Sequence, residues 1–244
     1  HEHGACLLMD FASAFPSLSQ EFLFTTLETL GLPDNARSLL KALYSESYCN
    51  VRHGNSETPG FMLEAGVRQG CPLSPLLDAT VAEVLLDRIE KDCPDTMVRA
   101  YADDTALVIK NFWKEAPKLE RIFREFGEIS GLHLNLSKCI IIPLGTGTLQ
   151  EFTTTRNNKM PAWANMPVAD CGKYLGFMIG PGKGNQSWDE PSNKYLQRCK
   201  SWAGQGVGMH YHTVAYNTFV VSTLSYVGQL EQVPKETLIQ ESKG

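Results

Sequence analysis

The chain has 244 residues, of which 43% are hydrophobic, and its formal net charge at pH 7 is −5. Such a chain can bury a globular core and is long enough for one or two domains. It has no run of about 18 apolar residues, so no transmembrane helix is predicted, and its first residues, His1 to Ala5, do not have the pattern of a signal peptide. We therefore expect a soluble, intracellular protein without a membrane partner.

The acidic balance is unusual for a protein that binds nucleic acid, because such proteins normally carry a basic surface. Either that surface is small here, or the basic parts of the full protein lie outside this chain. The seven cysteines are at least 22 residues apart and form no Cys-x-x-Cys pair. This spacing argues against a disulfide framework and a zinc knuckle, and it predicts free, mostly buried thiols.

Near the start, residues 5–9 are predicted to form a buried strand that runs directly into Asp10. A solvated carboxylate has no reason to end such a run. Ser19 is then expected to cap a helix that ends near Gly31, and Asp34 to begin a second helix. Short strands at 49–53 and 61–63 are separated by Gly54-Asn55, a typical hairpin turn.

The segment 66–77 reads Gly-Val-Arg-Gln-Gly-Cys-Pro-Leu-Ser-Pro-Leu-Leu. Ser74 followed by Pro75 predicts a helix start, with a buried stripe formed by Leu77, Val81, Val84, Leu85 and Ile89. The preceding loop presents Arg68 and Gln69 between two glycines. Arg68 can bind phosphate through its guanidinium, and bare glycine permits a close approach. The alternative is that the glycines only shape a loop.

Residues 98–109 are predicted to form a hairpin with Asp103 and Asp104 at its tip. Solvent could screen these charges, or a divalent cation could bind them. If this hairpin neighbours the strand at 5–9, Asp10 joins the pair. Two such charges about 4 Å apart repel by about 4 kcal/mol at an effective dielectric constant near 20. Divalent ions cancel that repulsion, and two Mg²⁺ ions form the usual clamp for phosphoryl transfer.

Further along, a helix with Leu119, Ile122, Phe123, Phe126 and Ile129 on its buried face is expected to end at Gly131. Strands are predicted at 132–136, 139–142 and 173–179. Residues 145–172 lack periodicity and are predicted to be a loop or a domain edge. From about Asp189 the pattern is helical.

Five segments in order resemble reverse transcriptases of the non-LTR retrotransposon type. They are residues 7–18 with Asp10, the Arg-Gln-Gly-Cys-Pro-Leu-Ser-Pro segment at 68–75, Tyr-Ala-Asp-Asp at 101–104, Gly-Leu-His-Leu-Asn at 131–135 with Lys138, and Lys-Tyr-Leu-Gly at 173–176. The second and third are the most specific. Together the five cover roughly residues 5–180.

The resemblance implies an α+β fold, the palm of a right-hand polymerase, in which helices back an antiparallel sheet. Partial fingers and a partial helical thumb would accompany it, with the palm at 1–180 and the start of the thumb at 181–244. The implied activity is RNA-directed DNA polymerisation, with an RNA template, a DNA primer and deoxynucleoside triphosphates as partners. A nuclear location is implied in the same way. The oligomeric state is left open.

The resemblance also implies residue roles. Asp10, Asp103 and Asp104 would be catalytic, and with Phe11 they would form the metal site for two Mg²⁺ ions, or for Mn²⁺ instead. The nucleotide-binding set would be Ala14, Phe15, Arg68, Gln69, Gly70 and Lys138, and the primer-binding pair Leu175 and Gly176. Phe15 matches the steric gate that rejects a 2′-hydroxyl, although it could be an ordinary core aromatic residue. Lys138 could likewise be a solvated lysine.

Two departures from the family leave other functions open. Pro16 stands where the family often has an acidic residue, and no basic fingers segment precedes the first strand, so the fragment alone could be weakly active or inactive. The alternatives are a non-catalytic RNA-binding or scaffold module of polymerase fold, and a decayed element fragment. A metal-dependent phosphatase or nuclease is a further class, but it would need neither Phe15 nor the Arg-Gln-Gly loop.

Overall fold

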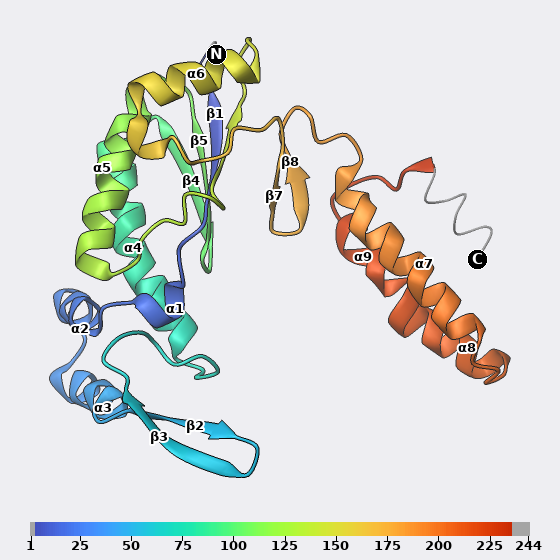
Figure 1. Cartoon of the computed structure of the whole chain (residues 1–244), viewed down its shortest axis with the longest axis horizontal. Coiled ribbons are helices and arrows are strands. Elements are labelled where there is room, and N and C mark those ends of the chain that lie inside the picture. The colour runs from blue at the N-terminus through green and yellow to red at the C-terminus, as the bar shows by residue number, and fades with distance from the viewer. Residues whose placement is uncertain (1–2, 236–244) are drawn as a thin grey trace. The chain divides into compact units, whose positions relative to one another are not determined.

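The structure is a computed structural model, and it describes residues 3–235 apart from the side chains of Ala14 and Pro59 (Figure 1). The chain divides into two compact units, one up to Ala169 and the other from Asp170 onward. We expected the division at 180. It comes earlier because residues 172–179 pack against a later helix, where the ring of Phe177 lies 5.2 Å from that of Tyr226.

The first unit contains a four-stranded sheet in the order β4-β5-β1-β6. Every neighbouring pair in it is antiparallel. The strands are β1 (Ala5–Met9), β4 (Thr96–Tyr101), β5 (Asp104–Ile109) and β6 (Ile140–Pro143). All five residues of β1 are buried because strands flank it on both sides. The predicted apposition of the first strand and the aspartate hairpin is confirmed.

Two helices, α4 (Ser74–Asp92) and α5 (Phe112–Ser130), cover one face of this sheet (Figure 1). Their buried side chains repeat every three or four residues and join Leu7, Met9 and Leu107 in one core. Gly131 ends α5 at φ 78°, as predicted. Two of the predicted core positions are wrong, since Val84 is 37% and Ile129 57% exposed. The fold is the expected palm, an antiparallel sheet backed by helices.

The start of α4 differs from the prediction. Ser74 already lies in the helix, and Leu73 is the N-cap residue without a side-chain hydrogen bond. The Ser74 hydroxyl instead donates to the carbonyl of Arg68 at 2.6 Å. The serine therefore fastens the loop that precedes the helix.

Between β1 and α4 the chain forms α1 (Ala14–Ser17), α2 (Gln20–Thr29), α3 (Asp34–Tyr44), β2 (Tyr48–His53) and β3 (Ser56–Met62). The predicted cap is confirmed, because the Ser19 side chain accepts a hydrogen bond from the Phe22 amide at 3.2 Å. Gly54 and Asn55 form the turn between β2 and β3, also as predicted.

Residues after α5 differ from two predictions. Residues 132–136 form no strand, and only Leu134 among them bridges to Phe11. Residues 145–172, predicted to be a loop or a domain edge, contain α6 (Leu149–Lys159) and a 3₁₀ turn, η1 (Pro161–Trp163), and the boundary between the two units falls within them, between Ala169 and Asp170. This helix has no apolar stripe, and its start is instead set by a capping box between Thr148 and Glu151.

The second unit begins with a hairpin, β7 (Gly172–Tyr174) and β8 (Phe177–Ile179), where we predicted one strand. Helical elements follow, as expected: η2 (Gln186–Trp188), α7 (Asp189–Ala203), α8 (Met209–Ala215), the π-helical η3 (Tyr216–Val220) and α9 (Ser222–Gly228). The seven cysteines are free, and three of them, Cys6, Cys93 and Cys139, are buried, fewer than expected. No helix within residues 3–235 is long and apolar enough to cross a membrane.

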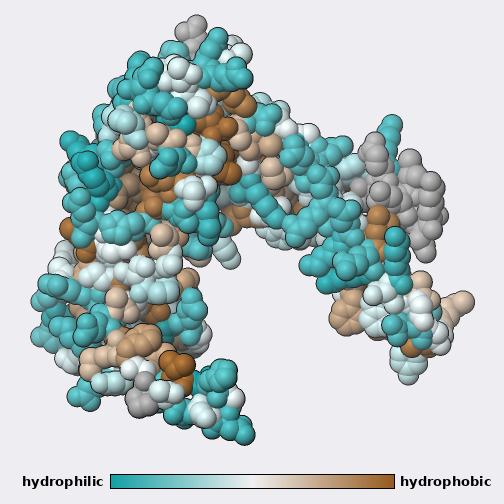
Figure 2. Space-filling model, in the orientation of Figure 1, coloured by the Kyte–Doolittle hydropathy of each residue, from teal (hydrophilic) through white to brown (hydrophobic). Residues whose placement is uncertain are grey.

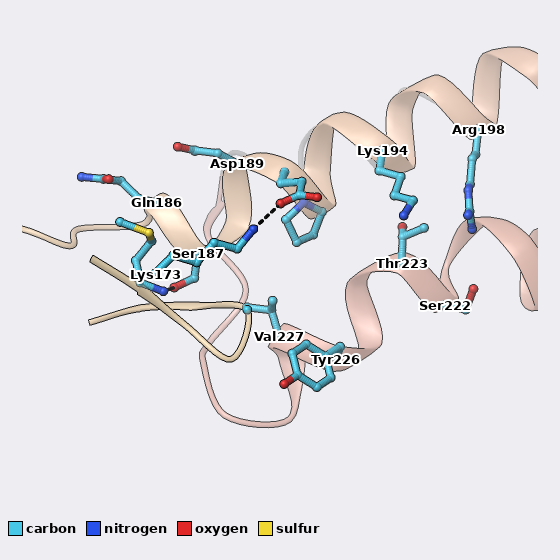
Figure 3. A pocket seen from close by; sticks show the side chains of 14 residues that line it. Lys173, Gln186, Ser187, Asp189, Lys194, Arg198, Ser222, Thr223, Tyr226 and Val227 are labelled. Atoms are coloured by element: carbon cyan, nitrogen blue, oxygen red, sulfur yellow. Dashed lines mark hydrogen bonds and ion pairs between the residues drawn. The ribbon is translucent and has the colours of Figure 1, made fainter. Parts of the chain in front are cut away.

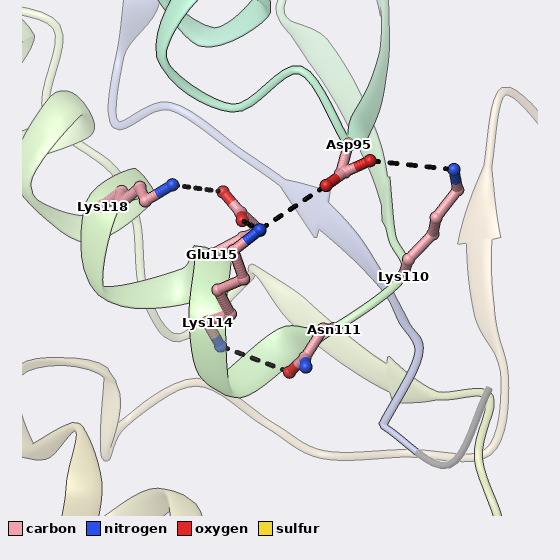
Figure 4. A network of polar contacts seen from close by, with 6 residues as sticks. All are labelled: Asp95, Lys110, Asn111, Lys114, Glu115 and Lys118. Carbon is pink, nitrogen blue, oxygen red and sulfur yellow. Dashed lines mark hydrogen bonds and ion pairs between the residues drawn. The ribbon is translucent and has the colours of Figure 1, made fainter.

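A polar network fastens the base of the aspartate hairpin to α5 (Figure 4). The buried Glu115 carboxylate lies 3.2 Å from the Lys114 ammonium and 3.1 Å from that of Lys118. The carboxylate of Asp95, in the turn before β4, lies 3.5 Å from the Lys114 ammonium and 3.8 Å from that of Lys110. Elsewhere on the first unit, apolar and hydrophilic side chains are interspersed over the visible surface (Figure 2).

Candidate active site

Asp10 and Asp104 lie at the ends of adjacent strands. The antiparallel register ends with Met9 opposite Thr105, and Asp10 and Asp104 are the residues that follow this last pair. Because side chains alternate along a strand, Asp104 points to the face of the sheet opposite to that of Thr105, and continuation of the same alternation carries Asp10 to that face. That face also carries Leu8 and Ala106, and it is opposite to the face that α4 and α5 cover.

Asp103 lies in the turn of the β4–β5 hairpin. Tyr101 pairs with Asp104, which leaves Ala102 and Asp103 as the two turn residues. Ala102 has φ 52°, a left-handed conformation that is strained for a residue with a side chain. Such strain is concentrated at functional sites, and here it makes a two-residue reversal possible. The predicted hairpin with both aspartates at its tip is confirmed.

Neighbouring carboxylates influence the protonation of Asp104 and Asp78. Desolvation, and then the negative charges of Asp103 and Asp10, raise the pKa of Asp104 above its usual range. Burial and the charge of Asp103 raise the pKa of Asp78, a residue of α4. A carboxylate pKa rises beside like charges because each charge disfavours ionisation of its neighbour. Four acidic side chains from three segments are therefore electrostatically linked.

The backbone around Asp10 is held by the segment after α5. The Asn135 amide donates to the Asp10 carbonyl at 2.8 Å, and the Asp10 amide donates to the Cys139 sulfur at 3.3 Å. Phe11 bridges to Leu134 and packs on the core. The Lys138 ammonium lies 3.8 Å from Asp10 Oδ2, beyond hydrogen-bond distance, and its side chain is 68% exposed.

The donor set fits a hard divalent cation. Asp10 Oδ2 is buried and has no hydrogen-bond partner among the described residues, and carboxylate oxygens are the ligands that Mg²⁺ prefers. Within residues 3–235, however, no three His, Cys, Asp or Glu side chains already converge on one point that could hold an ion.

The loop between β3 and α4 packs against the residues that follow Asp10. The Gly66 amide donates to the Leu18 carbonyl at 2.7 Å, and the Val67 amide to the Phe15 carbonyl at 2.8 Å. Gly66 has φ +83°, and a Cβ there would lie 2.7 Å from the carbonyl oxygens of Phe15 and Pro16. The structure therefore brings the predicted loop beside Phe15, which is partly buried against the core. Ala14 begins α1, and its side chain lies outside the described residues.

Arg68, Gln69 and Gly70 differ in their surroundings. Arg68 Nη2 donates at 2.6 Å to both the Leu43 carbonyl and the Ser47 hydroxyl. Its guanidinium therefore ties the loop to the end of α3. Gln69 is exposed, and Gly70 has φ +85° with open space around its Cα.

The predicted primer-binding pair lies in the second unit, at the turn between β7 and β8. Leu175 and Gly176 both have positive φ, 47° and 85°. The Tyr226 hydroxyl donates to the Leu175 carbonyl at 2.7 Å, and a Cβ on Gly176 would lie 2.9 Å from the Tyr226 ring. Beside this turn is a cavity of about 560 Å³ (Figure 3). Lys194, Arg198 and the hydroxyl groups of Ser222 and Thr223 line it.

Asp78 is the acidic residue that sequence reasoning passed over. It lies within the buried stripe of α4, between Leu77 and Val81, and is only 6% exposed. An acidic residue at a core-facing helical position was the available signal. Charged residues are almost never fully buried without a partner.

The comparisons with known proteins agree with this geometry. Residues 1–179 match the family described as reverse transcriptase (RNA-dependent DNA polymerase). The transposon TX1 uncharacterized 149 kDa protein of Xenopus laevis is 26% identical to this chain over 91% of the chain's length. The retrovirus-related Pol polyprotein from the type-2 retrotransposable element R2DM of Drosophila melanogaster is 27% identical over 72% of the chain's length. The chain spans 17% and 18% of the length of these two relatives.

Solved structures show the same fold. Apo telomerase from Candida tropicalis superposes with a TM-score of 0.56 at 13% identity, over 78% of this chain and 34% of that one. The same telomerase in complex with a TWJ fragment of telomeric RNA superposes with a TM-score of 0.55 at 12% identity, over 82% of this chain and 33% of the telomerase chain. With the palm sheet, the hairpin aspartates and the family match over most of its length, the chain belongs to the reverse transcriptase (RNA-dependent DNA polymerase) family, in the non-LTR retrotransposon type.

Proposed function

We propose that this chain is the catalytic palm of an RNA-directed DNA polymerase, with Asp10, Asp103 and Asp104 at the reaction centre. The observation that carries the proposal is the β1–β5 register, which brings Asp10 and Asp104 to the ends of two paired strands, directly after the last pair. A scaffold gains nothing from neighbouring carboxylates, because they repel one another. A cation-dependent enzyme needs them.

The reaction is nucleotidyl transfer. The primer 3′-oxygen forms a bond to the α-phosphorus of a deoxynucleoside triphosphate, the bond to pyrophosphate breaks, and the hydroxyl proton passes to solvent water. Two bound Mg²⁺ ions, or Mn²⁺ in their place, would supply Lewis acidity to the hydroxyl and charge neutralisation to the triphosphate. Asp10, Asp103 and Asp104 would hold these ions, with Phe11 contributing beside Asp10.

Lys138 is proposed to contact the triphosphate. Its ammonium is 3.8 Å from Asp10 Oδ2 and largely exposed, so it is free to reach an incoming phosphate. A lysine in this position neutralises leaving-group charge and can give a proton to pyrophosphate. The hydrogen bonds from the Asn135 amide to the Asp10 carbonyl and from the Asp10 amide to the Cys139 sulfur support a fixed relation between the lysine segment and the carboxylate.

The nucleotide sugar and base are proposed to lie over Ala14, Phe15 and the loop at 68–70. The hydrogen bond from Val67 to Phe15 fixes this gate relative to the loop. Gln69 and Gly70 are open to a ligand, whereas Arg68 already holds the end of α3 and would act mainly by shaping the loop. A bulky ring beneath the sugar rejects a 2′-hydroxyl sterically, and this favours deoxynucleotides.

The proposed partners are an RNA template and a DNA primer. The relatives that come from retrotransposons, and the telomerase solved with telomeric RNA, support this class of substrate. We propose that Leu175 and Gly176 contact the primer end, because their strained turn is held by Tyr226. The second unit would then be the start of a thumb, and the elements between β1 and α4 part of the fingers.

Primer extension on an RNA template with Mg²⁺, using the full-length protein, tests the proposal. The Asp103→Ala, Asp104→Ala double variant is expected to lose at least about a thousandfold in rate, which corresponds to about 4 kcal/mol of transition-state stabilisation. Asp87→Asn, an exposed aspartate on α4, is the matched control and should retain the wild-type rate.

An unchanged extension rate in the double variant would end the catalytic assignment. Thermal melts give an independent measurement, because an ion that binds only the folded state raises the melting temperature. Wild-type protein should be stabilised by millimolar Mg²⁺ and the double variant should not. Wild-type protein that neither extends a primer nor responds to Mg²⁺ would favour a non-catalytic RNA-binding module of the same fold.

A further inference from the structure

A small cavity lies beneath the tip of the aspartate hairpin. Its volume is about 20 Å³, and its walls come from α4, the hairpin, α5 and the segments that follow β1 and α5. Its polar lining groups are Asp78, Asp103 and Thr105, and the other lining residues are apolar. A cavity of about 10 to 15 Å³ is enough for one water molecule, which needs two to four polar partners. This cavity offers both the space and the partners.

Asp78 is the unexplained member of this group. Its side chain lies on the core-facing stripe of α4 and is 6% exposed. The only charge that perturbs it among the described residues is the negative charge of Asp103. A buried carboxyl without a partner costs several kcal/mol, whereas an apolar residue there would complete the stripe at no such cost. A ligand in the cavity would account for its presence.

We propose that Asp78 is a positioning residue for Asp103, which it holds through a single water molecule that donates one hydrogen bond to each carboxyl group. The proposal rests on the proposed function, because it gives Asp103 its orientation for catalysis. A water has two protons and can satisfy both carboxylates at once, with Thr105 as a further polar neighbour. The effect of the Asp103 charge on the pKa of Asp78 is consistent with the two groups being close.

This support matters because the hairpin tip is strained. Ala102, next to Asp103, has φ 52°, and a turn in that conformation persists only where its surroundings hold it. Hydrogen bonds behind a reactive carboxylate typically change activity or metal affinity by about 10- to 100-fold when they are removed. The buried water would therefore restrict Asp103 to the orientation in which it binds a cation.

Two substitutions separate this role from a structural one. Asp78→Asn keeps an oxygen that accepts from the water, so primer extension should stay within about threefold of wild type. Asp78→Leu keeps the branched shape but cannot accept a hydrogen bond, so kcat should fall by about 10- to 100-fold while KM for the nucleotide changes little. Asp87→Leu, at an exposed position of the same helix, is the control and should behave as wild type.

Thermal melts provide the decisive contrast. If Asp78 only stabilised the fold, Asp78→Leu would lower the melting temperature. We expect an unchanged or higher melting temperature without metal, because the substitution removes a buried carboxyl and its repulsion with Asp103. The Mg²⁺ concentration that gives half of the thermal shift should rise by about tenfold or more in Asp78→Leu and stay near the wild-type value in Asp78→Asn.

Three results would overturn the inference. One is an Asp78→Leu variant with wild-type extension and wild-type Mg²⁺ response. The second is equal losses in Asp78→Asn and Asp78→Leu, and the third is a high-resolution crystal structure in which no water lies between the two carboxyl groups. If the wild-type protein does not extend primers, the proposed function fails, and the Mg²⁺ melts and the crystal structure still decide the role of Asp78.

Discussion

Replacing Gly66 by alanine is expected to destabilise the first unit much more than the same replacement at Gly70. Both glycines have a left-handed backbone, with φ +83° and +85°, and a non-glycine residue there costs about 1 to 2 kcal/mol. The two sites differ in their neighbours. A Cβ on Gly66 would lie 2.7 Å from the Phe15 and Pro16 carbonyl oxygens, whereas no neighbouring atom lies within 4 Å of a Cβ on Gly70.

The steric contribution can be estimated from the hydrogen bonds that hold the loop. Backbone atoms cannot rotate away from the new methyl group, so the loop must move from the segment that follows Asp10. That movement breaks or weakens the bonds from Gly66 to Leu18 and from Val67 to Phe15, each worth about 0.5 to 1.5 kcal/mol. With the strain included, Gly66→Ala should cost about 2 to 5 kcal/mol, and Gly70→Ala about 1 to 2 kcal/mol.

Urea and thermal unfolding of both variants measure the difference. For a protein of this size, 1 kcal/mol corresponds to about 2 to 4 °C in melting temperature, so the two variants should differ by several degrees. Gly66→Ala should also slow primer extension, because Phe15 is displaced with the loop. Equal destabilisation of the two variants would refute the reasoning, since only the Gly66 site adds a clash to the strain.

Three other substitutions test separate parts of the chain. Burial alone would raise the pKa of Glu115, but hydrogen bonds from Lys118 and Lys114 outweigh it and leave that pKa below its usual value. Glu115→Gln should therefore cost about 1.5 to 3 kcal/mol of unfolding free energy at pH 7. This cost should shrink as the pH falls below about 4.3, the pKa of an unfolded glutamate, and then through the lower pKa of Glu115 in the folded protein. An undiminished cost at pH 3 would contradict this. Tyr226→Phe removes the hydroxyl that holds the β7–β8 turn and should cost about 1 kcal/mol in urea unfolding, whereas Tyr211→Phe, at a 67% exposed ring, should cost nothing measurable. Phe15→Val should raise ribonucleotide incorporation relative to deoxynucleotide incorporation in single-nucleotide extension, and an unchanged ratio would remove Phe15 from the gate.

Much of the fold could be predicted because its signals are local. The cap at Ser19, the stop at Gly131 and the turn at Gly54-Asn55 each depend on a few adjacent residues, and each prediction is confirmed. The same holds for the strand before Asp10 and the hairpin that carries Asp103. Hydrophobic runs and turn residues specify such elements without reference to distant parts of the chain.

The errors arose where local signals were weak or distant contacts prevailed. The helix α6 has no apolar stripe, so periodicity did not reveal it, although its capping box was readable. Leu134 alternates with polar neighbours like a strand residue, yet it makes only a single bridge to Phe11. Ser74 looks like a cap, but its hydroxyl bonds to the Arg68 carbonyl instead.

The sequence by itself determined the residues of the proposed site: acidic side chains at a strand end and a hairpin tip, with a glycine-bounded loop and an aromatic residue nearby. The tertiary structure alone decided how they meet. Asp10 and Asp104 lie at adjacent strand ends because β1 pairs with β5 in one particular register, and Asp78 lines the cavity below Asp103 because α4 packs beneath the hairpin. Strand register and helix packing minimise the free energy of the whole core, so no short segment of sequence contains them.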